Sequence, residues 1–174
     1  PGSIRTSSLA ALDGRRSLLV EIQALAVQTS AAQPRRSVKG LAASRVHQVI
    51  ASIERHCGIK MGNREVYVSV MGGFSITEPA ADLPMALAIG SAVSGIPLGS
   101  VAAWGEVALT GEVRAVDQSD RRRSESRRLG VDQVLEAGSG RVLADIFDDV
   151  GVGRAAAFGR RGLQAVSVGD RRGG

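Results

Sequence analysis

The segment TEPAADLP, residues 77–84, joins a run of alternating valines to an apolar run with helical spacing. A sharp turn from a strand into a helix is a place where many hydrolases expose a nucleophilic side chain. In this turn Pro79 is followed only by Ala80 and Ala81. A methyl group cannot attack a carbonyl carbon, so the turn that could carry catalysis lacks the atom for it.

Other side chains are poor substitutes for the missing nucleophile and its base. A serine nucleophile needs a neighbouring base, such as a lysine whose amine has a lowered pKa. Lys39 and Lys60 are the only lysines, and both fall in predicted loops before the turn. Ser75 is nearby but would still need a base. We interpret Glu78 and Asp82 as acids that complement the positive end of the following helix, rather than as a catalytic carboxylate pair.

Cys57 is the only cysteine of the chain. It therefore excludes an internal disulfide and a multi-cysteine zinc site built from this chain, and it favours a reducing, cytoplasmic setting. Its place on the apolar stripe of a predicted helix indicates a core thiol rather than a catalytic one. No Walker-type phosphate loop occurs, so we expect no P-loop ATP site and no cofactor in this chain.

The elements that hold these residues follow from hydrophobic spacing. Alternating apolar residues predict strands over 17–27 and 65–73, separated by a loop over 28–40 that is rich in small and basic residues. Apolar residues three and four apart predict one helix over 44–57, capped by Ser44 and ended by Gly58, and a second from near Ala80 to Val93.

The second half of the chain continues the same mixture. We expect a hairpin over 101–116, a polar helix over 118–129, a short strand over 131–138 and an amphipathic helix over 141–151. Interleaved strands and helices with antiparallel pairing predict an α+β fold, a two-layer α/β sandwich.

Composition limits the partners of the chain. It has 174 residues, of which 44% are hydrophobic and 3% aromatic, as expected for one domain with an aliphatic core. So few aromatic rings argue against a reader of single strands that stacks successive bases. The net charge is +5 and almost all the positive charge is arginine, which suits phosphate or carboxylate groups. No apolar run is long enough to span a bilayer, so no membrane partner is expected.

The chain divides into three expected parts. Residues 1–16 begin with PGS and are interpreted as a scar of tag removal followed by a linker. Residues 17–151 form the predicted domain. Residues 152–174 lose periodicity and gain glycine and arginine, which predicts a C-terminal extension or tail.

Three stretches together resemble one known family. They are LLVEIQALAV, VSVMGGFSITEPAADLPMALAI and WGEVALTGEVRAV, at their separations in this chain. They resemble the C-terminal Lon-protease-like domain of the bacterial DNA repair protein RadA, also called Sms, over about residues 17–137. The resemblance implies the ribosomal protein S5 domain 2-type fold.

The resemblance also implies which catalytic residues are missing from this chain. Active Lon proteases carry a serine nucleophile where this chain has Ala80, and a lysine base where it has Asp120. The resemblance therefore implies an inactive protease fold. It further implies that ATP, magnesium and zinc belong to the ATPase and zinc modules of the family, which this chain does not contain.

Two roles that need surfaces are then expected: hexamer assembly and sequence-independent binding of duplex or branched DNA. Phosphate contacts supply such binding without reading sequence. The main candidate is the polar helix, and a weaker one is the basic loop before the first helix. The candidate DNA-binding residues are Arg121, Arg122, Arg123, Arg127 and Arg128 in the helix, and Arg35 and Arg36 in the loop.

Three alternatives stay open. The arginines of the polar helix could form only a solvated surface. The chain could keep a residual serine-type peptidase activity, or it could be an assembly or partner-binding module without DNA contact. Peptide turnover and light scattering with and without DNA discriminate between these readings.

Overall fold

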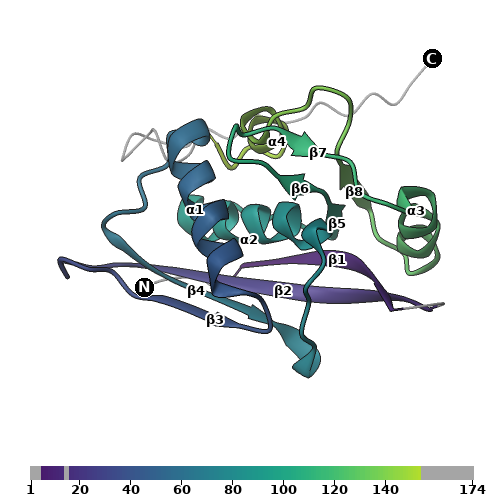
Figure 1. Ribbon diagram of the computed structural model, residues 1–174, viewed down its shortest axis with the longest axis horizontal. Helices are drawn as coiled ribbons and strands as arrows, with labels where there is room; N and C mark the ends of the chain where they lie inside the picture. The colour runs from purple at the N-terminus through teal and green to yellow at the C-terminus, as the bar shows by residue number, and fades with distance from the viewer. Residues whose placement is uncertain (1–4, 14–15, 154–174) are drawn as a thin grey trace, which may run out of the picture.

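The computed structural model describes residues 5–13 and 16–153. A mixed six-stranded sheet has the strand order β3-β4-β2-β1-β5-β8, and helices α1 and α2 lie over one of its faces (Figure 1). Its strands are β1 (Arg5–Asp13), β2 (Arg16–Gln28), β3 (Arg36–Lys39), β4 (Arg64–Val70), β5 (Val101–Trp104) and β8 (Gln133–Glu136). The helices are α1 (Ala43–Cys57), α2 (Asp82–Ser94), α3 (Ser119–Arg128) and α4 (Leu143–Asp149).

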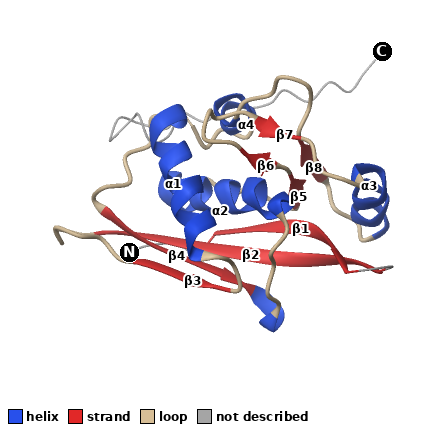
Figure 2. Ribbon diagram, in the orientation of Figure 1, coloured by secondary structure: helices blue, strands red, loops and turns tan. Residues whose placement is uncertain are grey.

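Pairing in the sheet mixes both directions. Strand β2 lies between β1 and β4 and is antiparallel to both, whereas β3 is parallel to β4. Strand β5 is parallel to β1 on one side and to β8 on the other. A separate antiparallel hairpin consists of β6 (Glu106–Val107) and β7 (Val113–Arg114). The expected α+β class is confirmed; α1 and α2 lie over the six-stranded sheet, and the β6–β7 hairpin lies on the same side as these helices (Figure 2).

The core lies between the sheet and α2. Alternate residues of β2, among them Ile22, point toward the helices, as the period of a half-buried strand requires. Helix α2 is buried along almost its whole length and contacts β1, β2 and α1. Gly90 of α2 permits close packing of α4, because a Cβ there would lie 2.7 Å from the Phe147 ring. The TEPAADLP turn lies at the other, N-terminal end of α2.

Strand β1 corrects the expected linker. Residues 5–13 pair along their whole length with β2, although the sequence analysis assigned residues 1–16 to a scar and linker. The segment RTSSLAALD contains few large apolar residues, so it gave no alternating signal. At the other end, Val152 is fully buried, although residues 152–174 are expected to form an extension or tail; residues 154–174 lie outside the described residues.

Two smaller expectations are also corrected. Residues 36–39 form the edge strand β3 inside the segment predicted as a loop, because only Val38 among them is hydrophobic. Helix α1 begins at Ala43 after an N-cap at Ala42, so Ser44 lies inside it. Its predicted end is confirmed, since Gly58 takes the left-handed conformation with φ of 67°. Among the described residues, no helix is long and apolar enough to cross a membrane.

Candidate functional site

The TEPAADLP turn is a tightly held connection between β4 and α2. Residues Pro79–Ala81 form a short 3-10 turn, and Ala80 is 1% exposed. The Ala80 carbonyl accepts a hydrogen bond of 3.1 Å from Gly105 N–H, whose own carbonyl accepts one of 3.0 Å from Leu83 N–H. The two reciprocal bonds fix the turn to the residue after β5. The position expected for a nucleophile is therefore well ordered and holds a methyl group.

A cavity of about 440 Å³ opens beside this turn. Its lining residues are Glu78, Pro79, Ala80, Glu106, Ala115, Val116, Asp117, Gln118 and Arg122. None of these nine described residues is a serine, threonine, cysteine, lysine or histidine. The usual nucleophiles and nitrogen bases of peptidases are thus missing from the lining.

Asp82 is bound elsewhere and does not form a pair with Glu78. It is 2% exposed, and its two carboxylate oxygens accept hydrogen bonds of 2.9 and 2.5 Å from Arg45 of α1. It also accepts the Val107 N–H of β6 at 3.1 Å. Burial raises the pKa of Asp82, while the Arg45 guanidinium acts in the opposite direction. Asp82 therefore joins α1, α2 and the hairpin, which is a role beyond the simple helix-end acid that the sequence suggested.

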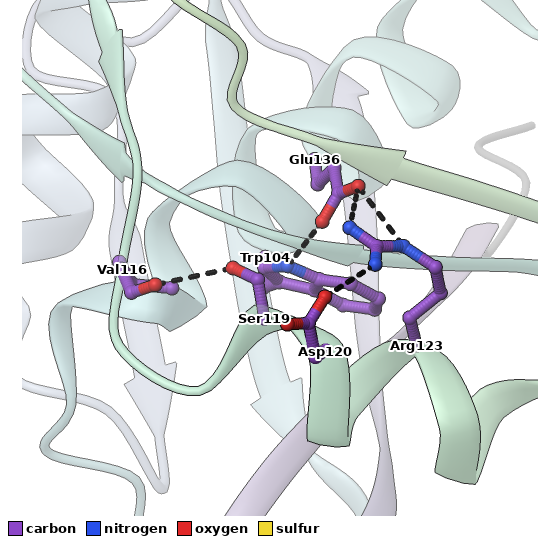
Figure 3. Close-up of polar contacts among 6 residues, drawn as sticks. All are labelled: Trp104, Val116, Ser119, Asp120, Arg123 and Glu136. Carbon is purple, nitrogen blue, oxygen red and sulfur yellow. Dashed lines mark hydrogen bonds and ion pairs between the residues drawn. The ribbon is translucent and has the colours of Figure 1, made fainter.

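Asp120 does not face the cavity. Its side chain is 98% exposed and accepts a hydrogen bond of 2.7 Å from Arg123, one turn further along α3 (Figure 3). Helix α3 instead contributes Arg122 to the cavity lining. The sequence comparison with Lon proteases pointed to Asp120 and not to Arg122. Which α3 side chain faces the cavity depends on the rotation of α3 about its axis, which the sequence does not show.

Arg122 connects α3 to the turn. Its side chain is 4% exposed and donates hydrogen bonds of 2.6 and 3.4 Å to the Glu78 carboxylate. Its Nε also donates to the Asp117 carbonyl at 3.2 Å. A guanidinium that is buried and occupied in this way is not exposed to an outside phosphate, so Arg122 has a structural role here.

Arg123 attaches α3 to the edge strand β8. It donates hydrogen bonds of 2.5 and 3.2 Å to one oxygen of Glu136, whose other oxygen accepts the Trp104 Nε1–H at 3.2 Å (Figure 3). Near the start of the helix, Ser119 Oγ donates to the Val116 carbonyl at 3.1 Å. Trp104 is the only tryptophan and is almost fully buried, so this contact ties α3 to the core.

The remaining arginines of α3 lie further out. Arg128 is 68% exposed and donates hydrogen bonds of 2.6 and 3.0 Å to Glu125. The hydrogen bond from Arg128 lowers the pKa of the Glu125 carboxyl. Arg121 donates to the Gln118 side chain at 3.2 Å, and Arg127 is exposed. Helix α3 thus has one buried arginine and four that reach solvent to different degrees.

The two arginines before the first helix differ in the same way. Arg35 is exposed on the edge of the sheet. Arg36 donates to three backbone carbonyls, those of Arg35 at 3.3 Å, Met61 at 2.9 Å and Arg64. Met61 lies just before β4 and Arg64 begins it, so Arg36 ties β3 to the start of β4 and has a structural role.

Cys57 and the histidines form no catalytic group with the turn. Burial raises the pKa of the Cys57 thiol to about 12, so the thiol is protonated at neutral pH. His56 hydrogen-bonds the Leu109 carbonyl at 2.8 Å, and His47 is exposed. Within residues 5–13 and 16–153, no group of three or more His, Cys, Asp or Glu side chains could hold a metal ion.

Comparison with known proteins finds several DNA repair proteins among the relatives of this chain. No protein-family profile matches the chain. The chain is 41% identical over 138 residues to the DNA repair protein RadA of Brucella abortus (strain 2308), covering 78% of this chain and 30% of that protein. The match to RadA of Mycobacterium tuberculosis (strain CDC 1551 / Oshkosh) is 39% over 126 residues, covering 72% and 26%.

A third relative agrees with these two. RadA of Rickettsia typhi (strain ATCC VR-144 / Wilmington) is 37% identical over 133 residues, covering 76% of this chain and 30% of that protein. The chain therefore spans about 30% of the length of the curated relatives that it matches. Over that region, the chain belongs to the RadA family of DNA repair proteins.

Proposed function

We propose that this chain is a proteolytically inactive Lon-like domain of a RadA-type DNA repair ATPase, and that it serves hexamer assembly and sequence-independent DNA binding in the cytoplasm. Kinship with RadA supports the repair role. The observation that carries the DNA-binding part is the outer face of α3, where Arg127 and Arg128 are exposed. ATP, magnesium and zinc belong, in this proposal, to the parts of the parent that lie outside this chain.

The cavity beside Ala80 supports the loss of proteolysis. A peptidase of this kind needs a nucleophile, a base within hydrogen-bond reach, and room for the reacting carbonyl. The room is present, but the cavity lining offers only carboxylates, one amide and an arginine as polar side chains. Arg122 cannot act as the base, because a guanidinium stays protonated in proteins.

The exposed arginines support DNA binding. Guanidinium groups pair with phosphate oxygens in a bidentate fashion, and each contact releases counterions from the duplex. Because Arg122 is buried against Glu78 and Arg36 is bonded to the backbone carbonyls of Met61 and Arg64, the proposed phosphate contacts come from the other candidates. They are Arg121, Arg123, Arg127 and Arg128 of α3 and Arg35 of the sheet edge.

A comparison of two double variants tests this proposal. In R127A/R128A the duplex affinity falls equally for unrelated sequences, and the slope of log affinity against log salt becomes shallower by about 0.9 for each lost phosphate contact. The matched control R55A/R114A removes two exposed arginines from α1 and β7. Fluorescence anisotropy of labelled duplexes over a range of salt measures the affinity and the salt slope of both double variants. An unchanged slope in R127A/R128A, or an equal loss in the control, contradicts the proposed site.

The competing functions are tested on the same protein. Light scattering with and without duplex DNA separates a DNA-binding domain from an assembly module that ignores DNA. Casein or a fluorogenic peptide tests the residual serine-type peptidase. Turnover that follows the purified protein and disappears when residues around Ala80 are changed would replace the present proposal.

A further inference from the structure

Helix α3 is unusual because its contact with the rest of the molecule is polar. Its only buried residues are Arg122 and Ser126, so no apolar side chain of the helix enters the core. The Ser126 hydroxyl is buried without a hydrogen-bond partner among the described residues. Among the described residues, the helix is therefore held mainly by the guanidinium groups of Arg122 and Arg123, and Arg123 is also one of the proposed phosphate contacts.

The carboxylates that contact these arginines form two sets. The inner set consists of Glu78 and Glu136, which lie outside α3 and bind Arg122 and Arg123. The outer set consists of Asp120 and Glu125, which lie on α3 itself and each bind an arginine three residues further along. Only the inner set connects α3 to the rest of the fold.

The outer set is placed to compete with phosphate. Asp120 and Glu125 bind Arg123 and Arg128 at 2.7 and 2.6 Å, in pairs that include one strongly exposed member each. Phosphate oxygens accept from a guanidinium as carboxylate oxygens do, so a phosphate competes for the Nε and Nη that Arg128 gives to Glu125 and for the single Nη that Arg123 gives to Asp120. Exposed pairs three residues apart on a helix are weak, so phosphate can replace them without undocking α3.

We propose that Asp120 and Glu125 are internal competitors for the DNA-binding face of α3, occupying Arg123 and Arg128 until a phosphate replaces them. The inference rests on the proposed DNA-binding function and adds its regulation. Each competing carboxylate weakens DNA binding twice, by occupying a guanidinium and by repelling the phosphate that approaches it. The inner pairs persist in both states and keep the helix in place.

The test removes the competitors without moving the helix. In D120N/E125Q, duplex affinity rises roughly threefold to tenfold, which corresponds to releasing two exposed ion pairs. The slope of log affinity against log salt stays that of the unmodified chain, because the same arginines contact phosphate in both proteins. Circular dichroism measures the melting temperature of the single variants D120N and E125Q. A single variant that keeps the melting temperature of the unmodified chain tests the competition without a change in stability.

A charge-matched control separates local competition from a general gain of positive charge. The double variant E21Q/E112Q neutralises an exposed carboxylate on β2 and a partly exposed one beside β7, and Glu112 is paired with Arg114 at 3.5 Å. Its affinity gain is smaller than that of D120N/E125Q. If the two gains are equal, or if D120N/E125Q gains nothing while the unmodified chain binds DNA, the competition is refuted and the proposed function stands. If none of the proteins binds, the proposed function fails first.

Discussion

At the scale of single residues, Ala80 decides what the turn can do. Its methyl group lies in a turn that is fixed to Gly105 by two hydrogen bonds, one from Gly105 N–H to the Ala80 carbonyl and one from Leu83 N–H to the Gly105 carbonyl. A serine introduced at this position gains a hydroxyl but no base, since the cavity lining contains no lysine or histidine. The inactivity proposed for this fold therefore depends on two missing groups rather than one.

The variant A80S is expected to stay inactive for this reason. Casein digestion followed by fluorescence should remain at the background of the unmodified chain, because an isolated serine hydroxyl is a weak nucleophile at neutral pH. A serine-reactive fluorophosphonate provides an independent reading and should not label the variant. Rapid labelling would show that a base operates at the turn after all.

Arg122 gives a second prediction at this scale. Replacing it by alanine leaves the half-buried Glu78 carboxylate without its partner and opens space beside the turn. Truncation of one member of a largely buried pair costs about 1–3 kcal/mol of unfolding free energy here, below the full cost for a pair that is buried on both sides. Urea unfolding measures this loss of unfolding free energy. The control R127A removes an exposed side chain and should change the unfolding free energy by less than about 0.5 kcal/mol.

At the scale of elements, α3 shows where sequence reasoning succeeds and where it stops. Its helical composition and polar character were predicted correctly. The number of arginines also suggested a surface for phosphate, but composition could not tell which guanidiniums are occupied within the fold. Arg122 and Arg36 are bound to groups distant in the chain, and such partners are visible only once the elements are packed.

The same limit explains the strands that were missed. The larger strands β2 and β4 were predicted because each alternates large apolar residues with polar ones. Strands β1 and β3 consist mainly of small or charged residues, and they become strands by pairing with β2 and β4. The strand conformation of such segments depends on pairing with neighbouring strands, so local propensity alone does not identify them.

The Glu125–Arg128 pair makes a prediction about α3 that pH can test. The hydrogen bond from Arg128 lowers the pKa of Glu125, so the pair stabilises α3 above the usual pKa of a glutamate and is lost as pH falls through the lowered value. In R128A the Glu125 pKa should rise toward 4.5, its unperturbed value. Carboxyl-carbon NMR over a pH titration measures it, and equal Glu125 values in the two proteins would show that the pair does not form in solution.

At the scale of the whole molecule, β1 determines where the domain begins. It lies between β2 and β5 and therefore joins the two halves of the sheet. A chain that begins at Arg16 would leave the edges of β2 and β5 unpaired and open the core above them. We expect such a truncation to lose cooperative urea unfolding and to aggregate. A truncated chain that unfolds as cooperatively as the complete one would return residues 5–13 to the status of a linker.

The whole molecule also combines a charged helix with a cavity whose described lining lacks the usual nucleophiles of peptidases. Helix α3 lies beside β8, at one end of the sheet (Figure 1). Arg122 belongs to α3 and also lines the cavity, so a substitution at the cavity can alter the position of α3. In the proposed function, the cavity beside Ala80 has room for a substrate but no nucleophile among its described lining residues, and the phosphate contacts lie on the outer face of α3. That division is the basis of the proposed role in DNA binding.

The most direct measurement of this claim is the anisotropy of three labelled duplexes of unrelated sequence, titrated with the complete chain between low and moderate salt. The account predicts that all three bind with similar affinity, and that log affinity falls linearly with log salt with one common slope. No binding even at low salt, or affinities that depend on sequence and not on salt, would contradict it.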